Sequence, residues 1–350
     1  MLGVALALSA LVALAFMPAS WLPGVGGVDA DVDACGRASG DEAIAACTRA
    51  IESGQYDGRR LAALFNNRCS EWNGKHDSDK ALADCDQAIG LEPDYALAFF
   101  NRGNASFAKG QYDRAMDDYD QSIRLNPNYA LAFNNRGNTH LNQGQWDRAI
   151  ADYSEAIRLN PRKAIMFYNR GTAYDAAGQH DRAIEDFSQA ILLEPGHADV
   201  FYNRGLAYKG KGEYDRAIAD YDQAIRLDPN YANAFNNRGN AYFAKCDYDR
   251  AIADFNQAIQ LDPDHLQSFI NRAAAYNAKG DYDRAIADSD QAIRLNPNLA
   301  SAFYNRGTSW ERKNDPQRAL ADYRRFSELA PSDLDGQRAV ERLTKATGNP

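Results

Sequence analysis

Apolar and small residues recur along this chain at helical spacing, within a motif that is rewritten every 34 residues. The clearest copy covers residues 198–231. With Ala198 as position 1, its apolar or small residues occupy positions 1, 4, 8 and 11, and then 17, 20, 21, 24, 27, 28 and 30. Spacings of three and four place each set on one face of a helix. The pattern therefore predicts two amphipathic helices in each repeat.

A proline at position 32 fixes the period of the motif. It recurs without insertion as Pro93, Pro127, Pro161, Pro195, Pro229, Pro263, Pro297 and Pro331. Eight repeats follow, at 62–95, 96–129, 130–163, 164–197, 198–231, 232–265, 266–299 and 300–333. Because a period of this length is typical of stacked supersecondary units that bury their apolar faces against one another, we predict an all-α fold, an α-solenoid of antiparallel helix pairs.

Turn and small residues refine the expected hairpin. Glycine at position 15 suits a left-handed cap at the end of the first helix. Asparagine or aspartate at position 33, after the proline, is expected to N-cap the next first helix, as with Asn128 and Asn230. Glycine at position 8 and alanine at position 20 are both small, and we expect this pair to set the distance between the two helices.

The flanking segments are predicted to close the array. Residues 29–61 read as a degenerate N-terminal hairpin, because 41–44 resemble the opening of later second helices, and residues 334–350 read as a C-terminal capping helix and tail. Residues 1–28 carry no charge and 2–17 are almost entirely apolar. They predict a signal peptide and a periplasmic or secreted protein. The alternatives are an uncleaved membrane anchor, with the repeats outside the cytoplasm, and a misassigned start.

Cysteine placement bears on the same question of export. Cys35, Cys47, Cys69 and Cys85 lie in the first quarter of the chain, whereas Cys246 stands alone. Four cysteines close together favour two disulfides in an oxidising compartment, and we expect Cys35–Cys47 and Cys69–Cys85, each within one hairpin. The alternative is four small buried thiols.

Charge and motifs exclude several classes of function. A formal charge of −9 argues against a nucleic-acid track, which needs a clustered basic face. The sequence contains no H-E-x-x-H, G-x-S-x-G or P-loop motif, and its five histidines occupy different positions in different repeats. We therefore expect no catalytic, metal or cofactor site.

The repeat resembles the tetratricopeptide repeat, whose aromatic, glycine, alanine and proline pattern it meets across eight repeats. The matching residues are Phe201, Gly205, Tyr208, Ala217, Tyr221, Ala224 and Pro229. The resemblance, to tetratricopeptide repeat proteins of the exported bacterial type, implies a right-handed superhelix. It also implies a concave groove, lined by the first helices, that binds peptides or protein segments.

Two charged positions depart from the family pattern. Position 7 is arginine in all eight repeats, where the family usually has leucine: Arg68, Arg102, Arg136, Arg170, Arg204, Arg238, Arg272 and Arg306. Position 23 is always aspartate: Asp84, Asp118, Asp152, Asp186, Asp220, Asp254, Asp288 and Asp322. Equal numbers of opposite charges predict a ladder of ion pairs, within or between hairpins. Anion binding by the arginines is the alternative.

The strongest candidate for ligand binding is an asparagine series at position 6. It comprises Asn67, Asn101, Asn135, Asn169, Asn203, Asn237, Asn271 and Asn305. In the family this position faces the groove, and the series resembles the asparagine ladder of O-GlcNAc transferases, which grips a peptide backbone. A side-chain amide both donates and accepts, so it can pair with any main chain. The alternative is that these amides bond only to neighbouring helices.

Other residues are expected to share that groove. They are Asn104, Asn138 and Asn240 at position 9, and Phe100, Tyr168, Tyr202 and Tyr304 at position 5. The sequence thus predicts a non-enzymatic scaffold that binds an extended protein segment. The alternative is an assembly module that oligomerises, or organises an envelope complex, through its convex face or its ends. The sequence specifies neither the partner nor the oligomeric state.

Overall fold

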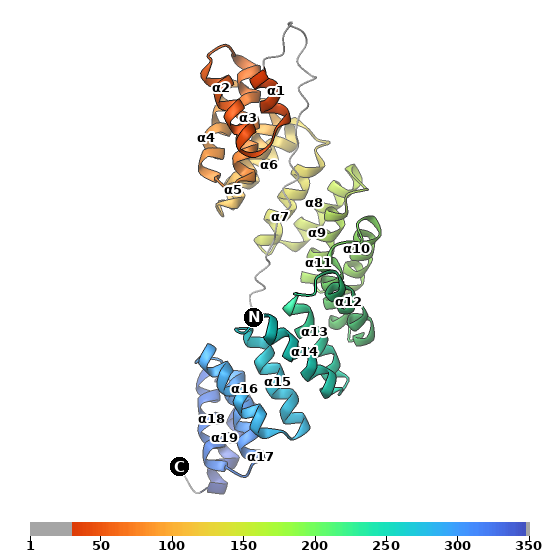
Figure 1. The fold of residues 1–350 in the computed structure, drawn as a ribbon, viewed down its shortest axis with the longest axis vertical. Coiled ribbons are helices and arrows are strands. Elements are labelled where there is room, and N and C mark those ends of the chain that lie inside the picture. Colours follow the sequence, from red (N-terminus) through yellow and green to blue (C-terminus); the bar gives the residue numbers. More distant parts are fainter. Residues whose placement is uncertain (1–29, 348–350) are drawn as a thin grey trace. The chain divides into compact units, whose positions relative to one another are not determined.

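The computed structural model describes residues 30–347, which form nineteen helices and no strand (Figure 1). The chain divides into two compact units, one ending at Ala177 and the other beginning at Gly178. The expected leader, residues 1–28, lies outside the described residues. Within 30–347, no helix is both long enough and apolar enough to cross a membrane.

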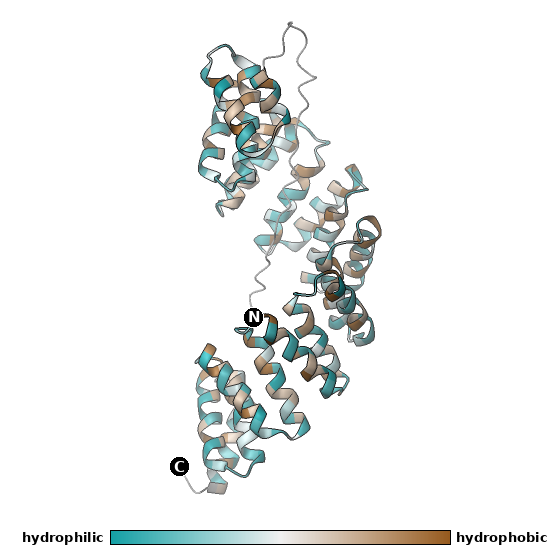
Figure 2. Ribbon diagram, in the orientation of Figure 1, coloured by the Kyte–Doolittle hydropathy of each residue, from teal (hydrophilic) through white to brown (hydrophobic). Residues whose placement is uncertain are grey.

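Consecutive helices pack as antiparallel hairpins within each unit. The first unit contains α1 (Ala30–Arg37), α2 (Gly40–Glu52), α3 (Gly58–Gly74), α4 (Ser78–Leu91), α5 (Ala96–Ala108), α6 (Tyr112–Leu125), α7 (Ala130–Asn142), α8 (Trp146–Leu159) and α9 (Ala164–Ala176). The second contains α10 (His180–Leu193), α11 (Ala198–Gly210), α12 (Tyr214–Leu227), α13 (Ala232–Ala244), α14 (Tyr248–Leu261), α15 (Leu266–Lys279), α16 (Tyr282–Leu295), α17 (Ala300–Arg312), α18 (Pro316–Leu329) and α19 (Leu334–Thr347). Hydrophilic and hydrophobic residues are mixed along every helix (Figure 2), as amphipathic helices require.

The turn between the two helices of a hairpin has a left-handed residue at position 15. Gly110, Gly144 and Gly212 have φ of 71°, 71° and 75°, so the expected glycine caps are confirmed. Where the glycine is lost, the backbone stays the same: Cys246 has φ of 59°. The turn therefore keeps its geometry even when the residue there has a β-carbon, which the left-handed region disfavours.

The expected N-caps at position 33 are wrong. The residue that caps α7 is Tyr129, at position 34, and its side chain makes no capping hydrogen bond. The polar residue before the proline has a different role, because Asn126 accepts a hydrogen bond at 3.2 Å from the backbone N–H of Asn128. The Asn-Pro-Asn segment is thus a local turn closed by its own side chain.

Glycine at position 8 packs against the aromatic ring at position 24 rather than against alanine at position 20. A β-carbon added to Gly239 would lie 2.7 Å from Cε1 of Phe255, and one added to Gly103 would lie 2.7 Å from Cε1 of Tyr119. Both rings are almost completely buried. Close approach of the helices therefore depends on the absence of a side chain at position 8, a correction to the expected glycine–alanine pair.

Arginine at position 7 binds aspartate at position 23 of the same hairpin. The fork is bidentate in the third repeat, where Arg136 donates from Nε to Asp152 Oδ2 at 2.9 Å and from Nη2 to Oδ1 at 2.6 Å. The pairs are Arg68–Asp84, Arg102–Asp118, Arg136–Asp152, Arg204–Asp220, Arg238–Asp254, Arg272–Asp288 and Arg306–Asp322. The predicted ladder of structural ion pairs is confirmed for these seven repeats.

The same arginines also reach back to the preceding hairpin. Arg136 Nη1 donates to Asp120 Oδ1 at 2.6 Å, and Arg204 Nη1 donates to Ser188 Oγ at 2.9 Å. One guanidinium thus joins the two helices of its own hairpin and the second helix before it. Burial raises the pKa of Asp118 while the hydrogen bonds from Arg102 oppose that rise. The ladder therefore acts both within and between hairpins.

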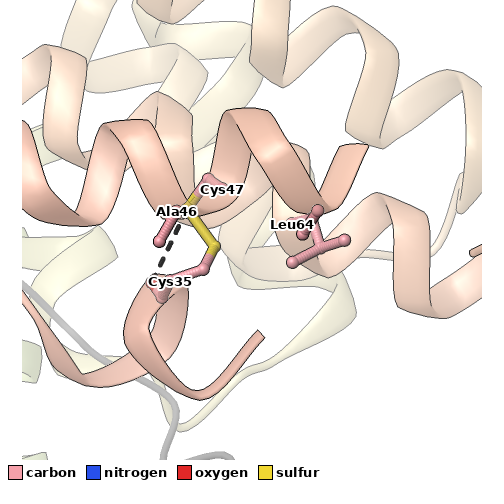
Figure 3. Packing of buried hydrophobic residues seen from close by; sticks show 5 residues of the cluster. Cys35, Ala46, Cys47 and Leu64 are labelled. Atoms are coloured by element: carbon pink, nitrogen blue, oxygen red, sulfur yellow. Dashed lines mark hydrogen bonds between the residues drawn. A yellow bond between two sulfur atoms is a disulfide. The ribbon is translucent and has the colours of Figure 1, made fainter. Parts of the chain in front are cut away.

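Two disulfides close the N-terminal end of the first unit, and both expected pairings are confirmed. Cys35 and Cys47 join α1 to α2, with Leu64 of α3 beside them (Figure 3). Cys69 and Cys85 join α3 to α4, with their Cα atoms 5.6 Å apart. This second pair occupies positions 8 and 24. A covalent bond therefore stands where other hairpins place a glycine against a ring.

Helix α19 covers the apolar face that α18 would otherwise expose at the C-terminal end. Ala339 and Leu343 are buried in a cluster with Leu320 and Tyr323. This helix is the cap that a stack of nearest-neighbour hairpins requires.

Candidate protein-binding face

The first helices carry a chemically distinct surface. We define the first-helix face as positions 2, 5, 6, 9 and 12 of α3, α5, α7 and α9 in the first unit, and of α11, α13, α15 and α17 in the second. The second helices carry many ion pairs instead. An example is Lys245 in the turn before α14, which pairs with Asp215 of α12. Paired charges are thus frequent on that side, whereas asparagine and tyrosine recur on the first-helix face.

Most position 6 asparagines bond to the preceding first helix. Asn101 Nδ2 donates to Asn66 Oδ1, Asn169 to Asn134 Oδ1 and Asn271 to Asn236 Oδ1, each at 3.0 Å. The same donation runs from Asn135 to Asn104 Oδ1, from Asn237 to the Tyr202 hydroxyl and from Asn305 to the Ile270 carbonyl. In these six repeats the amide nitrogen therefore joins adjacent hairpins, as the alternative interpretation of the series holds.

Burial removes four predicted residues from a ligand's reach. Phe100 is 2% exposed, Asn169 4%, Asn101 6% and Asn104 8%. Phe100 packs on Tyr129, with ring centroids 4.9 Å apart. These four residues are part of the wall between hairpins, which corrects their expected placement in the groove. Sequence spacing alone missed this, because neighbouring hairpins cover these residues. Asn101 and Asn169 bond to the preceding first helix, and Asn104 accepts from Asn135 of the next one.

The three tyrosines at position 5 are only partly covered. Tyr202 lies against Tyr231 with ring centroids 4.9 Å apart, and burial raises the pKa of its hydroxyl to about 12. Tyr304 lies against Phe326 at 5.0 Å. Together with Tyr168 they give the face its aromatic character while leaving part of each side chain open to contact.

A smaller set of amides is available for a ligand. Among the described residues, the side chains of Asn67 and Asn240 form no hydrogen bond, although both are half-buried. Asn138 accepts at Oδ1 from the Tyr153 hydroxyl at 2.7 Å and leaves its Nδ2 open. Asn203, on α11, is half-buried but is not one of these open amides. The open amides are therefore Asn138 and Asn240 at position 9 and Asn67 at position 6.

Ser268 and His265 are close enough together to be considered as a nucleophile and its base. Ser268 Oγ lies 2.7 Å from His265 Nδ1, and His265 Nε2 lies 3.0 Å from Asn233 Oδ1. Ser268 is fully buried and also donates to Asn236 Oδ1, while its backbone N–H is capped by His265. A hydroxyl in that setting cannot meet a substrate, so the contact caps α15. Within residues 30–347, no group of three His, Cys, Asp or Glu side chains is placed to hold a metal ion.

A stack of helical hairpins with a partly open, amide-rich face defines a helical repeat scaffold. Family models for the tetratricopeptide repeat match residues 103–144 and 207–245, 134–199, 232–265, 255–287 and 272–344. Together these matches span more than half of the sequence, and the chain belongs to the tetratricopeptide repeat proteins.

Solved structures with similar folds have low sequence identity to the chain. A tetratricopeptide repeat protein from Parabacteroides merdae has 20% identity and a TM-score of 0.57, over 71% of this chain and 98% of that one. The Cut9 and Hcn1 hetero-tetramer has 19% and 0.57, over 79% and 54%. PilW, a type IV pilus biogenesis factor, has 18% and 0.55, over 60% and 98%. At these identities the likeness concerns the fold alone. Comparison with curated proteins gave no match.

Proposed function

We propose that this chain is a non-enzymatic scaffold whose first-helix face binds an extended segment of another protein. The observation that carries the proposal is the set of open amides on the first helices, Asn67 and Asn138 in the first unit and Asn240 in the second, together with the half-covered tyrosines at position 5. A side-chain amide can meet both the N–H and the C=O of a bound main chain. The buried members of the asparagine series support this face indirectly, because they hold the first helices in register.

We also propose that the protein acts outside the cytoplasm, in the periplasm or as a secreted protein. The two disulfides carry this part, since all four cysteines are fully buried and paired at the N-terminal end. Structural disulfides persist in oxidising compartments and are rare where thiols are kept reduced. Mass spectrometry of the protein's N-terminus from the exported fraction would test export and the cleavage of residues 1–28. Recovery of the intact protein from the cytoplasm with free thiols would contradict it.

Site-specific photo-crosslinking tests the binding face. A photo-reactive phenylalanine at Asn240, on α13, is compared with one at Leu192, a residue of α10 that is 74% exposed. We expect position 240 to capture a segment of a different protein. Crosslinks formed from position 192 alone would refute the proposal, and crosslinks to a second copy of this chain would favour an assembly module instead.

The captured segment then allows a quantitative test. Asn240→Ala removes one open amide of the second unit, and at about 0.5–1.5 kcal/mol for a hydrogen bond the affinity should fall roughly two- to tenfold. The matched control is Asn169→Ala, which removes one buried bridging amide. The control should lower the free energy of unfolding, whereas the first variant should leave it unchanged.

A further inference from the structure

Lys209 differs from the other lysines of this acidic chain. Eight of the ten lysines pair with aspartate or glutamate: Lys75, Lys80, Lys109, Lys211, Lys245, Lys279, Lys313 and Lys345. Lys163 is exposed to solvent. Lys209, at position 12 of α11, is half-buried, and within residues 30–347 it has no carboxylate partner. Its charge is thus partly withdrawn from water without the compensation that the others receive.

The surroundings of this ammonium group are neutral and ordered. Lys209 Nζ donates to Asn237 Oδ1 at 2.7 Å. The orientation of that amide is fixed, because its Nδ2 donates to the Tyr202 hydroxyl at 2.9 Å and to the Asn233 carbonyl at 3.1 Å. Asp199, on the same helix, accepts from the Tyr231 hydroxyl at 2.8 Å. An ammonium has three N–H donors, and only one of them is used here.

Other hairpins achieve the same link without a charge. Asn73, at position 12 of α3, donates to the Asn101 carbonyl at 2.8 Å, and Asn277, at position 12 of α15, donates to the Asn305 carbonyl at 2.9 Å. A neutral amide therefore suffices to join position 12 to the next first helix. Burial also lowers the pKa of the Lys209 ammonium, which indicates a cost of keeping it charged at this position.

We propose that Lys209, oriented by Asn237, is the anion-binding position of the first-helix face and pairs with a carboxylate of the bound segment. This inference rests on the proposed function and narrows it to a class of partner, a segment that presents a carboxylate beside α11 and α13. The carboxylate comes from an aspartate or glutamate side chain or from the segment's C-terminus. Either source would supply the acceptor that the two unused N–H groups lack.

A library of short random synthetic peptides distinguishes these sources. The peptides are acetylated and C-terminally amidated in one arm and carry a free C-terminus in the other, and binding is measured to the full-length protein with its disulfides intact. Enrichment of one acidic residue in the amidated arm identifies a side-chain carboxylate. Binding that requires the free C-terminus identifies the terminal one.

Three variants make the assignment specific. Lys209→Gln should abolish the carboxylate preference and weaken the best peptide roughly tenfold or more, as expected for a hydrogen bond to a charged group. Lys209→Glu should shift the preference to lysine or arginine. Lys163→Gln, the exposed control, should change nothing. Because Lys209→Gln removes an incompletely paired charge, its unfolding midpoint should equal or exceed that of the parent protein, which separates weaker binding from misfolding.

The outcomes separate this inference from the proposal beneath it. Peptides that bind without a carboxylate preference, or with one that survives Lys209→Gln, would overturn the role of Lys209 and leave the binding face intact. If no peptide bound in either arm, the proposed function would fail and this inference with it.

Discussion

Replacing Gly239 with alanine tests whether the hairpins depend on a missing side chain at position 8. The new β-carbon would lie 2.7 Å from Cε1 of Phe255, a distance that real β-carbons essentially never show, and 3.0 Å from Cδ1. Phe255 is fully buried, so its ring cannot swing into solvent. Overpacking of this kind costs about 1–3 kcal/mol. Alanine regains about 1 kcal/mol of helix propensity. We expect net destabilisation by up to about 2 kcal/mol.

A second glycine provides the matched control. Gly90 lies within α4, and a β-carbon there would meet no atom within 4 Å. Gly90→Ala should therefore stabilise the protein by about 0.5–1 kcal/mol. The same substitution thus has opposite signs at two helical positions, a difference that helix propensity alone cannot produce.

A double-mutant cycle locates the cause in the ring. Phe255→Leu shortens the side chain that meets Gly239, so combining it with Gly239→Ala should cost less than the sum of the two single changes, by about 1 kcal/mol. The natural precedent is the next hairpin, where Ala273 at position 8 accompanies Ser289 at position 24. Urea unfolding followed by circular dichroism gives the midpoints, and amide exchange in α13 and α14 gives the local stability. If Gly239→Ala stabilised the protein as much as Gly90→Ala, the packing argument would be refuted.

Four further predictions concern charge, pH, strain and cross-links. Asp118→Ala should cost about 1–3 kcal/mol, because Nε and Nη2 of the partly buried Arg102 lose their acceptor while Nη1 keeps Asp86, whereas the exposed neighbour Asp117→Ala should leave the urea midpoint almost unchanged. Burial holds the pKa of His265 below its ordinary value, so the stability it contributes is present above about pH 6.5 and is lost as the pH falls through its lowered pKa; His265→Asn should flatten midpoints measured as the pH is lowered from about 6.5. Cys246→Gly should raise the free energy of unfolding by about 1 kcal/mol, because the turn there has φ of 59°; unaltered thermal unfolding would contradict this. Replacing Cys69 and Cys85 together with alanine should cost about 3 kcal/mol through the 16-residue loop they close, and calorimetry of the oxidised protein and the variant would measure it.

Local patterns predicted most of this fold because each contact is repeated and close in sequence. The helix pairs and the left-handed glycine turns follow from spacing alone, and a constant 16 residues separates Arg136 from Asp152. Cysteine placement favoured the two disulfides but left buried thiols as an alternative, which the structure decides. The predicted N-caps at position 33 were wrong for an equally local reason, because the turn is closed by Asn126, which accepts a hydrogen bond from the backbone of that same turn. Periodicity identifies which residues share a face of a helix.

The candidate site was less predictable because it depends on how one hairpin covers the next. Position 6 faces outward on an isolated helix, yet Asn169 becomes buried when its amide meets Asn134 of the preceding first helix. Stacking offsets of this kind are not encoded in the period. Lys209 was missed for a different reason: one lysine at position 12 has no counterpart in other repeats, and its lack of a carboxylate partner is visible only once the other lysines are paired.

Both disulfides lie within the first four helices, so the two ends of the array differ in their resistance to unfolding. Because each hairpin is stabilised chiefly by its neighbours, unfolding of the array starts at its less stable end. Unfolding from the N-terminal end is opposed by two disulfides, whereas the last described hairpins are held by non-covalent contacts such as the cluster of Leu320, Tyr323 and Leu343. Proteolysis, heating or mechanical force should therefore unfold the chain from α19 towards the N-terminus. The disulfide-bonded N-terminal hairpins should be the fragment that stays folded longest.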